Sequence, residues 1–394
     1  ASERFSFEEQ LVISEIDVER LRGERLVNTT FAANVRTHQE IPVQHISTEL
    51  VSSRELSLTR PVEPHPFVPS GSRQLDERCE EIFSIQVAGL AKRLVHTHCK
   101  TVVLGISGGL DSTLALLVSV EAMRRLGRPA SDVCGVTMPC FGTSDRTYNN
   151  SWELMRTLGI SCKEINIKDA VNLHFSDIGH DPNIHNGTYE NSQARERTQI
   201  LMDYASVVGG IVVGTGDLSE LALGWCTYNG DHMSMYGVNT GVPKTLVRHI
   251  VQYVADTCGN DTLRDVLVDI LDTPVSPELL PTAADGTIAQ QTEKLVGPYE
   301  LHDFYLYYVL RFGFSPTKIY HLARTAFDGR YEPEVLLAWL KNFYRRFFAQ
   351  QFKRSCLPDG PKVGSVTLSP RGDWRMPSDA CNTLWMAELE KLEV

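Results

Sequence analysis

The sequence has no run of 18 apolar residues, no excess of basic residues and no apolar segment near its N-terminus. The first and third absences argue against a membrane-spanning helix and against a signal peptide. The formal net charge is −11, whereas a nucleic-acid-binding surface needs a basic face. We therefore expect a cytoplasmic protein that binds neither a membrane nor a nucleic acid.

Closely spaced cysteines are also lacking. The nine cysteines are scattered along the chain and form no C-x-x-C pair. An odd number of isolated cysteines is typical of reduced thiols rather than of a disulfide framework or a zinc site. The first of them is Cys79, so the N-terminal part of the chain contains no thiol.

A proline-rich segment divides the chain. Four prolines fall within residues 60–69, which prevents a continuous helix or a central strand and indicates a linker. Before it, residues 11–16 alternate as in a strand and residues 18–26 suit a short charged helix. We expect one unit over residues 1–70 and a main domain over residues 71–394, in keeping with about 150 residues per domain.

After the linker, short apolar segments alternate with amphipathic ones, which is typical of an α/β doubly wound parallel sheet. Ligands of such sheets bind at the carboxyl ends of the strands. The C-terminal region is expected to be helical over residues 301–352. The pattern predicts helices over residues 75–98, 111–125, 148–158 and 191–208, and strands over residues 101–106, 133–138, 162–167 and 210–215.

The segment Ser107-Gly-Gly-Leu-Asp-Ser112 lies between a predicted strand and a predicted helix. Its glycines let the backbone turn tightly and present N–H groups to an anion, and the helix N-terminus adds its positive dipole end. Asp111 can hold a magnesium ion that bridges phosphates. The segment is neither a Walker A loop nor a G-x-G-x-x-G loop. A plain strand-to-helix turn capped by Ser or Asp has the same composition.

The S-G-G-x-D-S segment resembles the pyrophosphate loop of the N-type ATP pyrophosphatases. From about residue 77 to the C-terminus, further elements resemble those of the long, glutamine-dependent NAD synthetases. These elements are E-N-S-Q-A-R-E-R at 190–197, G-T-G-D-L-S-E-L-A-L-G-W at 214–225, P-K-T-L-V at 243–247, S-P-E-L at 276–279, Q-F-K-R-S at 351–355 and S-P-R-G-D-W-R at 369–375. The resemblance implies an adenine nucleotide alpha hydrolase-like fold and a homo-oligomer.

The resemblance implies that ATP is a co-substrate and that Asp111 and Glu220 hold Mg²⁺. Two carboxylates on one divalent ion that bridges phosphates agree with the hard-ligand chemistry of magnesium. Lys244 would neutralise charge as pyrophosphate leaves, which completes a catalytic set of Asp111, Glu220 and Lys244. The implied ATP-binding residues are Gly105, Ile106, Ser107, Gly108, Gly109, Leu110, Asp111, Ser112, Thr215 and Lys244.

The resemblance also implies a site for nicotinate adenine dinucleotide. Taken one at a time, Trp225 suits core packing, Lys353 a solvated surface and Glu220 the start of a helix, and only their joint spacing favours binding. Arg195 resembles an arginine of the short, ammonia-only members, although Tyr228 stands where those members carry lysine. The implied dinucleotide-binding residues are Asn191, Arg195, Glu220, Trp225, Cys226, Thr227, Tyr228 and Lys353.

The implied activity is that of a ligase that forms a C–N bond. The carboxylate of nicotinate adenine dinucleotide attacks the α-phosphate of ATP, pyrophosphate leaves, and ammonia displaces AMP to give NAD. Residues 1–70 resemble the end of the nitrilase-like glutaminase domain that long members carry in the same chain. Because no cysteine precedes Cys79, we expect ammonia rather than glutamine as the nitrogen source. We also expect residues 1–70 to be poorly packed.

Three alternatives share some of these features. A GMP synthetase-like amidase has the S-G-G-x-D-S loop, but the E-N-x-Q-A-R and S-P-R-G-D-W-R elements disfavour it. A thiouridine-forming enzyme would need a catalytic cysteine pair. A non-catalytic nucleotide-binding subunit would bind ATP without turnover, and the intact set Asp111, Glu220 and Lys244 disfavours it.

Overall fold

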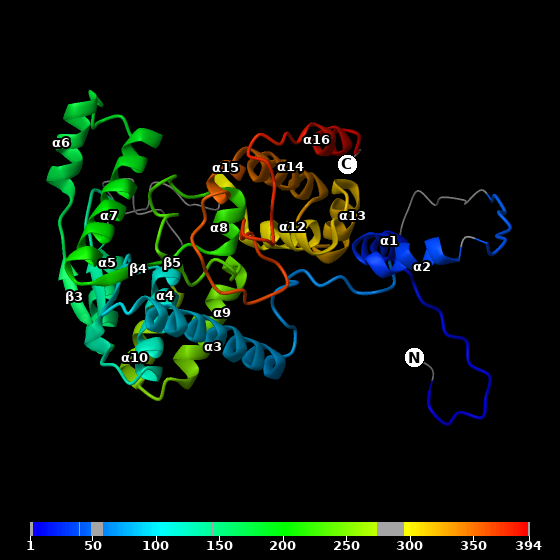
Figure 1. Cartoon of the computed structure of the whole chain (residues 1–394), viewed down its shortest axis with the longest axis horizontal. Helices are drawn as coiled ribbons and strands as arrows, with labels where there is room; N and C mark the ends of the chain where they lie inside the picture. Colours follow the sequence, from blue (N-terminus) through cyan, green and yellow to red (C-terminus); the bar gives the residue numbers. More distant parts are fainter. Residues whose placement is uncertain (1–2, 39, 49–57, 143–144, 274–294, 393–394) are drawn as a thin grey trace.

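The structure, a computed structural model, describes residues 3–38, 40–48, 58–142, 145–273 and 295–392. The S-P-E-L element at 276–279 lies outside these residues. Within them, five strands form a parallel sheet in the order β3-β2-β1-β4-β5, which confirms the predicted fold class (Figure 1). The strands are β1 (Thr101–Gly105), β2 (Val133–Thr137), β3 (Ser161–Glu164), β4 (Gly210–Gly214) and β5 (Tyr236–Gly237).

The central strand β1 is buried on both faces. Val102 pairs with Val133 and Ile211, and these side chains join one hydrophobic core. The next residue, Val103, lies on the other face and joins a second core. Strands that are apolar on both faces are typical of a parallel sheet covered by helices on both sides.

Helices cover both faces of the sheet. The first core contains residues of α3 (Ser72–Thr97), α4 (Leu110–Arg125), α5 (Asp145–Thr157), α9 (Lys244–Thr257) and α10 (Asp261–Leu271). The second core contains residues of α6 (Lys168–Ile178) and α7 (Gly187–Val207). A short 3-10 turn, η1 (Ala130–Asp132), leads into β2.

The region after residue 295 is helical, as predicted, but it is divided into several helices. They are α12 (Tyr299–Phe312), α13 (Pro316–Ala326), α14 (Pro333–Ala349), α15 (Gln351–Arg354) and α16 (Thr383–Glu390). Gly313 ends α12 with a φ of 64°, and prolines open α13 and α14.

The short helix α8 (Leu218–Leu223) follows β4, but its apolar side chains pack into the helical core. This helix therefore joins the sheet to the helical region.

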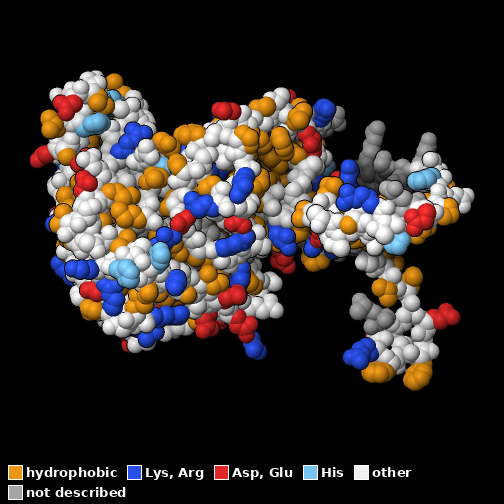
Figure 2. Space-filling model, viewed as in Figure 1, with side chains coloured by type: hydrophobic (Ala, Val, Ile, Leu, Met, Phe, Trp, Pro, Cys, Tyr) orange, Lys and Arg blue, Asp and Glu red, His pale blue; other side chains and the backbone are white. Residues whose placement is uncertain are grey.

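The N-terminal segment projects from one side of the molecule and meets the helical region where Lys318 pairs with Glu19 at 3.2 Å and the Arg20 guanidinium lies 4.8 Å from the centre of the Phe312 ring (Figures 1 and 2). It contains α1 (Val18–Val27) and α2 (Thr29–Thr37), in which no residue is buried. The helix expected over residues 18–26 is confirmed, but the strand expected over residues 11–16 is wrong. Apolar residues of this stretch such as Leu11 and Ile13 are exposed, and without a neighbouring strand its backbone groups have no ladder to join.

None of the helices in the described part of the chain combines the length and the apolar character that crossing a bilayer requires.

Candidate active site

A cleft of about 350 Å³ lies at the carboxyl ends of β1, β2 and β4. The chain leaves β1 toward β2 on one side, whereas β4 lies on the other side. Such a reversal of strand order is where doubly wound sheets bind ligands.

The loop between β1 and α4 forms one wall of this cleft. Gly108 has a φ of 87°, in the left-handed region that favours glycine. The Ser107 hydroxyl accepts a hydrogen bond from the Gly109 N–H at 3.2 Å and lies 3.2 Å from the Ser112 hydroxyl. The serine side chains thus brace the loop itself. Within the described residues no side chain caps the N-terminus of α4, so its first N–H groups are suited to bind phosphate.

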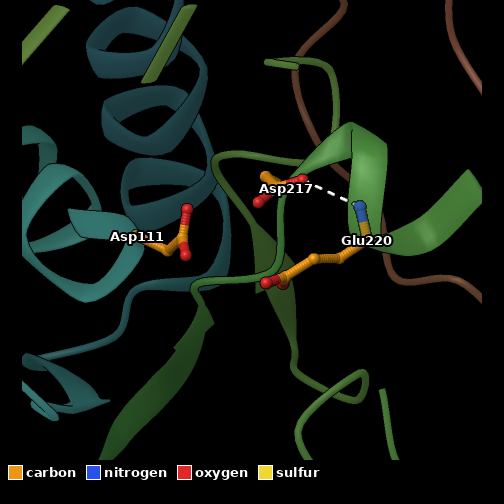
Figure 3. A group of neighbouring side chains, drawn as sticks. All are labelled: Asp111, Asp217 and Glu220. Carbon is orange, nitrogen blue, oxygen red and sulfur yellow. Dashed lines mark hydrogen bonds between the residues drawn. The ribbon is translucent and has the colours of Figure 1, made fainter. Parts of the chain in front are cut away.

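Three carboxylates gather beside this loop. Figure 3 shows Asp111 at the start of α4 opposite Asp217 and Glu220 of the α8 region. One oxygen from each side chain lies within 4.8 Å of the other two. Asp217 is the N-cap of α8 and accepts a hydrogen bond from the Glu220 N–H at 2.9 Å. The Glu220 side chain is therefore held at the first turn of a helix whose start faces the cleft.

Lys244, the first residue of α9, pairs with all three carboxylates. Its Nζ lies 2.6 Å from Asp111, 2.6 Å from Asp217 and 2.9 Å from Glu220, and its side chain is only 8% exposed. Burial alone would lower the pKa of Lys244, but the three carboxylates raise it well above its ordinary value. Burial, opposed by Lys244, raises the pKa of Glu220 to about 7 and that of Asp217 well above its usual range.

The residues of this cluster fit a magnesium ion. Three carboxylates surround the single charge of Lys244, and the Oδ1 atom of Asp111 is buried and accepts no hydrogen bond from the described residues. Oxygen ligands of this kind match the preference of Mg²⁺. The candidate ligands are the two residues expected from the sequence together with Asp217.

The cleft brings together the residues implied for ATP binding and two residues implied for the dinucleotide, Glu220 and Trp225. Residues 105–112, Thr215, Glu220, Trp225 and Lys244 all line it. The other residues implied for the dinucleotide do not line this cleft. They are Asn191, Arg195, Cys226, Thr227, Tyr228 and Lys353.

Most of these remaining residues organise the turn that follows α8. The Thr227 hydroxyl donates to Asn191 Oδ1 at 2.8 Å. Lys353 Nζ donates to the carbonyls of Gly224 and Cys226 at 2.8 and 2.6 Å. In this structure Lys353 therefore fixes the backbone on either side of Trp225.

Arg195 also contacts this turn, since its Nε donates to the Tyr228 carbonyl at 3.1 Å, but its side chain is exposed.

Arg197 lines the cleft, although it was not among the expected site residues. Ala194, Arg197, Thr198 and Leu201 of α7 all face the cleft, at the spacing of one helical face. Arg195 lies about 200° around the helix from Arg197, given 3.6 residues per turn. The E-N-S-Q-A-R-E-R element contains both arginines, and this helical periodicity distinguishes them.

Replacing Arg197 with alanine is expected to raise the KM for ATP by about tenfold or more, because a hydrogen bond to a charged group contributes about 1.5–3 kcal/mol. Steady-state kinetics with varied ATP will measure this. Arg195→Ala is the matched control and should leave the KM for ATP close to that of the unaltered protein. The opposite ranking of the two variants would contradict the placement of Arg197 in the cleft.

Asn239 is a second site residue that the sequence did not reveal. It is fully buried, and its Nδ2 donates to the carbonyls of Asp111 and Thr215 at 2.9 and 3.0 Å. Gln86 in turn donates to Asn239 Oδ1 at 3.0 Å. One amide side chain thus ties together the two segments that carry the expected ATP-binding residues.

The sheet order, the glycine-rich loop and the acidic cluster at the strand ends are typical of α/β proteins that bind phosphate at the carboxyl ends of their strands. The model of the NAD synthase family matches residues 82–325. The chain belongs to this NAD synthase family.

Relatives with assigned names agree. The chain is 44% identical over 417 aligned positions to the glutamine-dependent NAD(+) synthetase of Mycobacterium leprae, with 99% of this chain and 61% of the relative covered. It is 28% identical to that of Thermotoga maritima, with 94% and 58% covered. The chain thus spans about three-fifths of the length of these relatives.

A solved structure shares the fold. The crystal structure of a glutamine-dependent NAD(+) synthetase from Cytophaga hutchinsonii has a TM-score of 0.67 at 18% identity, with 80% of this chain and 56% of that chain covered. At this level of identity the similarity concerns the fold alone.

Proposed function

We propose that this chain is a ligase that uses ATP to convert the carboxylate of nicotinate adenine dinucleotide into the amide of NAD. Family membership and the name shared by the relatives support this assignment. The observation that carries it is Lys244, held by three carboxylates beside an uncapped phosphate loop. That arrangement suits the release of pyrophosphate from ATP.

In the first step, a substrate carboxylate oxygen bonds to the α-phosphorus and the bond to the β-phosphate oxygen breaks. The leaving pyrophosphate gains negative charge, which the N–H groups of residues 107–112 and the ammonium of Lys244 stabilise. A bound Mg²⁺, held by Asp111, Asp217 and Glu220, would neutralise phosphate charge. In the second step, ammonia attacks the acyl carbon, AMP leaves and the nitrogen loses a proton.

The turn after α8 is the proposed contact for the dinucleotide. Trp225 lines the cleft and its ring is available for stacking on a heteroaromatic base. Arg346 belongs to helix α14, and its guanidinium lies 5.3 Å from the centre of the Trp225 ring. Lys353 contributes by holding the backbone of this turn, and Asn191 does so through Thr227.

We also propose that residues 1–70 correspond to the end of a glutaminase domain. The apolar residues before residue 48 are exposed, which is typical of a surface that packs against a partner.

The test is NAD formation from nicotinate adenine dinucleotide, ATP and Mg²⁺, with ammonium chloride or glutamine in parallel reactions. We expect NAD, AMP and pyrophosphate in equal amounts with ammonium. Omitting the dinucleotide should abolish AMP release, which controls for plain ATP hydrolysis. The parallel reaction measures whether glutamine supplies the nitrogen, and the absence of NAD from both reactions would contradict the proposed activity.

A further inference from the structure

A buried carboxylate outside the cleft connects the two segments that supply Glu220 and Lys244. Asp303 lies in α12 and is 1% exposed. Its Oδ1 accepts a hydrogen bond from the Ser219 hydroxyl. Its Oδ2 accepts from the N–H and the hydroxyl of Thr245, at 3.1 and 2.7 Å. A carboxylate buried in this way has to be satisfied by donors, and here donors meet both oxygens.

The Ser219 hydroxyl extends this contact. It donates to Asp303 and accepts a hydrogen bond from the backbone N–H of Lys244 at 2.8 Å. Ser219 is the residue before Glu220, and Thr245 is the residue after Lys244. A single carboxylate therefore holds the backbone beside both members of the Glu220–Lys244 pair.

Asp303 also supplies what the start of α9 lacks. The N-cap residue of α9 is Pro243, which provides no side-chain hydrogen bond. The first N–H groups of a helix need acceptors, and a negative charge near a helix N-terminus is favourable. The N–H groups of Lys244 and Thr245 find these acceptors in Ser219 and Asp303. The cap comes from a helix that lies 58 residues further along the chain.

We propose that Asp303 is a positioning residue that fixes Glu220 relative to Lys244 and thereby sets the cation affinity and the turnover of the cleft. The turnover part rests on the proposed function, whereas the cation part does not. Asp303 does not line the cleft, so its effect has to pass through Ser219 and Thr245.

Two substitutions, called the relay variants below, test whether Asp303 acts on the cleft through Ser219 and Thr245. Asp303→Asn keeps the shape but offers one acceptor oxygen to three donors, and Ser219→Ala removes the link to α8 while leaving Thr245 bound to Asp303. Tyr305→Phe is the matched control, because it removes one buried hydrogen bond, from the Tyr305 hydroxyl to the Leu336 carbonyl, from the same helix. The measurements are Mn²⁺ binding by electron paramagnetic resonance in the presence of ATP, kcat and KM for NAD formation, and thermal unfolding.

We expect both relay variants to bind Mn²⁺ about tenfold more weakly and to lose about 10- to 100-fold in kcat, which is the usual effect of losing a group that orients metal ligands. The KM for nicotinate adenine dinucleotide should change little. Tyr305→Phe should lower the melting temperature without changing Mn²⁺ affinity or kcat.

The proposal is overturned if Ser219→Ala retains the Mn²⁺ affinity of the unaltered protein, whether or not Asp303→Asn folds. It is also overturned if Tyr305→Phe weakens Mn²⁺ binding as much as the relay variants do. If the unaltered protein makes no NAD but both relay variants still bind Mn²⁺ more weakly, the positioning role stands and the proposed function fails.

Discussion

Replacing Lys244 with methionine is expected to lower the rate of NAD formation by roughly 10²- to 10³-fold, the usual effect of removing one preorganised donor that stabilises a developing anion. Lys244 Nζ lies within 3 Å of three carboxylates, so it is positioned before ATP binds and needs no rearrangement from solvent. Methionine has a similar length but no charge. Steady-state kinetics with AMP release as the readout will measure the loss.

The same substitution has a second expected effect, on stability. Without the ammonium, the buried Asp217 and the half-buried Glu220 have no counter-charge, and breaking a buried ion pair costs about 3–5 kcal/mol. Because burial already raises the pKa values of both groups, they can take up protons in the folded state. The loss of stability should therefore be largest above pH 7 and should diminish as the pH falls. Mg²⁺ should restore part of it by replacing the missing charge.

Urea unfolding with EDTA or with Mg²⁺, at several pH values, will measure this effect. Lys92→Met is the control, because Lys92 is exposed on α3 and its loss should change neither stability nor rate. A Lys244→Met variant whose unfolding free energy does not depend on Mg²⁺ would contradict a cation site at these carboxylates.

The fold was predictable because its signals are local. The apolar segment that became β1 and the glycines at 108 and 109 lie within nine residues of one another, and local periodicity identifies both. Strand β5 spans two residues and is too short to produce such a pattern. Helix α9 was not predicted, although Leu246, Val247, Ile250 and Val251 have the spacing of a buried helix face.

The candidate site was predictable only in part. Asp217 and Glu220 form a D-x-x-E pair, a helix-start pattern that could have indicated both carboxylates. Asp303 carries no such signal, since it meets Ser219 across 84 residues and Thr245 across 58 residues of sequence. Only the packing of α12 against α8 and α9 brings these groups together, and short-range patterns do not report on that packing.

The phosphate loop allows an equally direct test. Replacing Gly108 with alanine is expected to lower kcat/KM for ATP by about 10²-fold or more, since a misplacement of about 1 Å has that effect on positioned groups. A Cβ atom at Gly108 would overlap the backbone carbonyl of Thr147, which is part of α5. The φ of 87° adds strain for any L-residue with a side chain. The loop therefore has to move away from the position that places its N–H groups at the start of α4.

Gly127→Ala is the matched control for this variant. Gly127 follows the same helix with a φ of 67°, but a Cβ atom there would meet no other atom within 4 Å. The Gly127→Ala variant therefore carries only the backbone strain, about 1–2 kcal/mol. It should lower stability without changing kcat/KM for ATP. If both variants lose stability but Gly108→Ala keeps its ATP kinetics, residues 107–112 do not bind the phosphates. If only Gly108→Ala loses its ATP kinetics, the close approach of Gly108 to the Thr147 carbonyl is what holds the loop in its binding conformation.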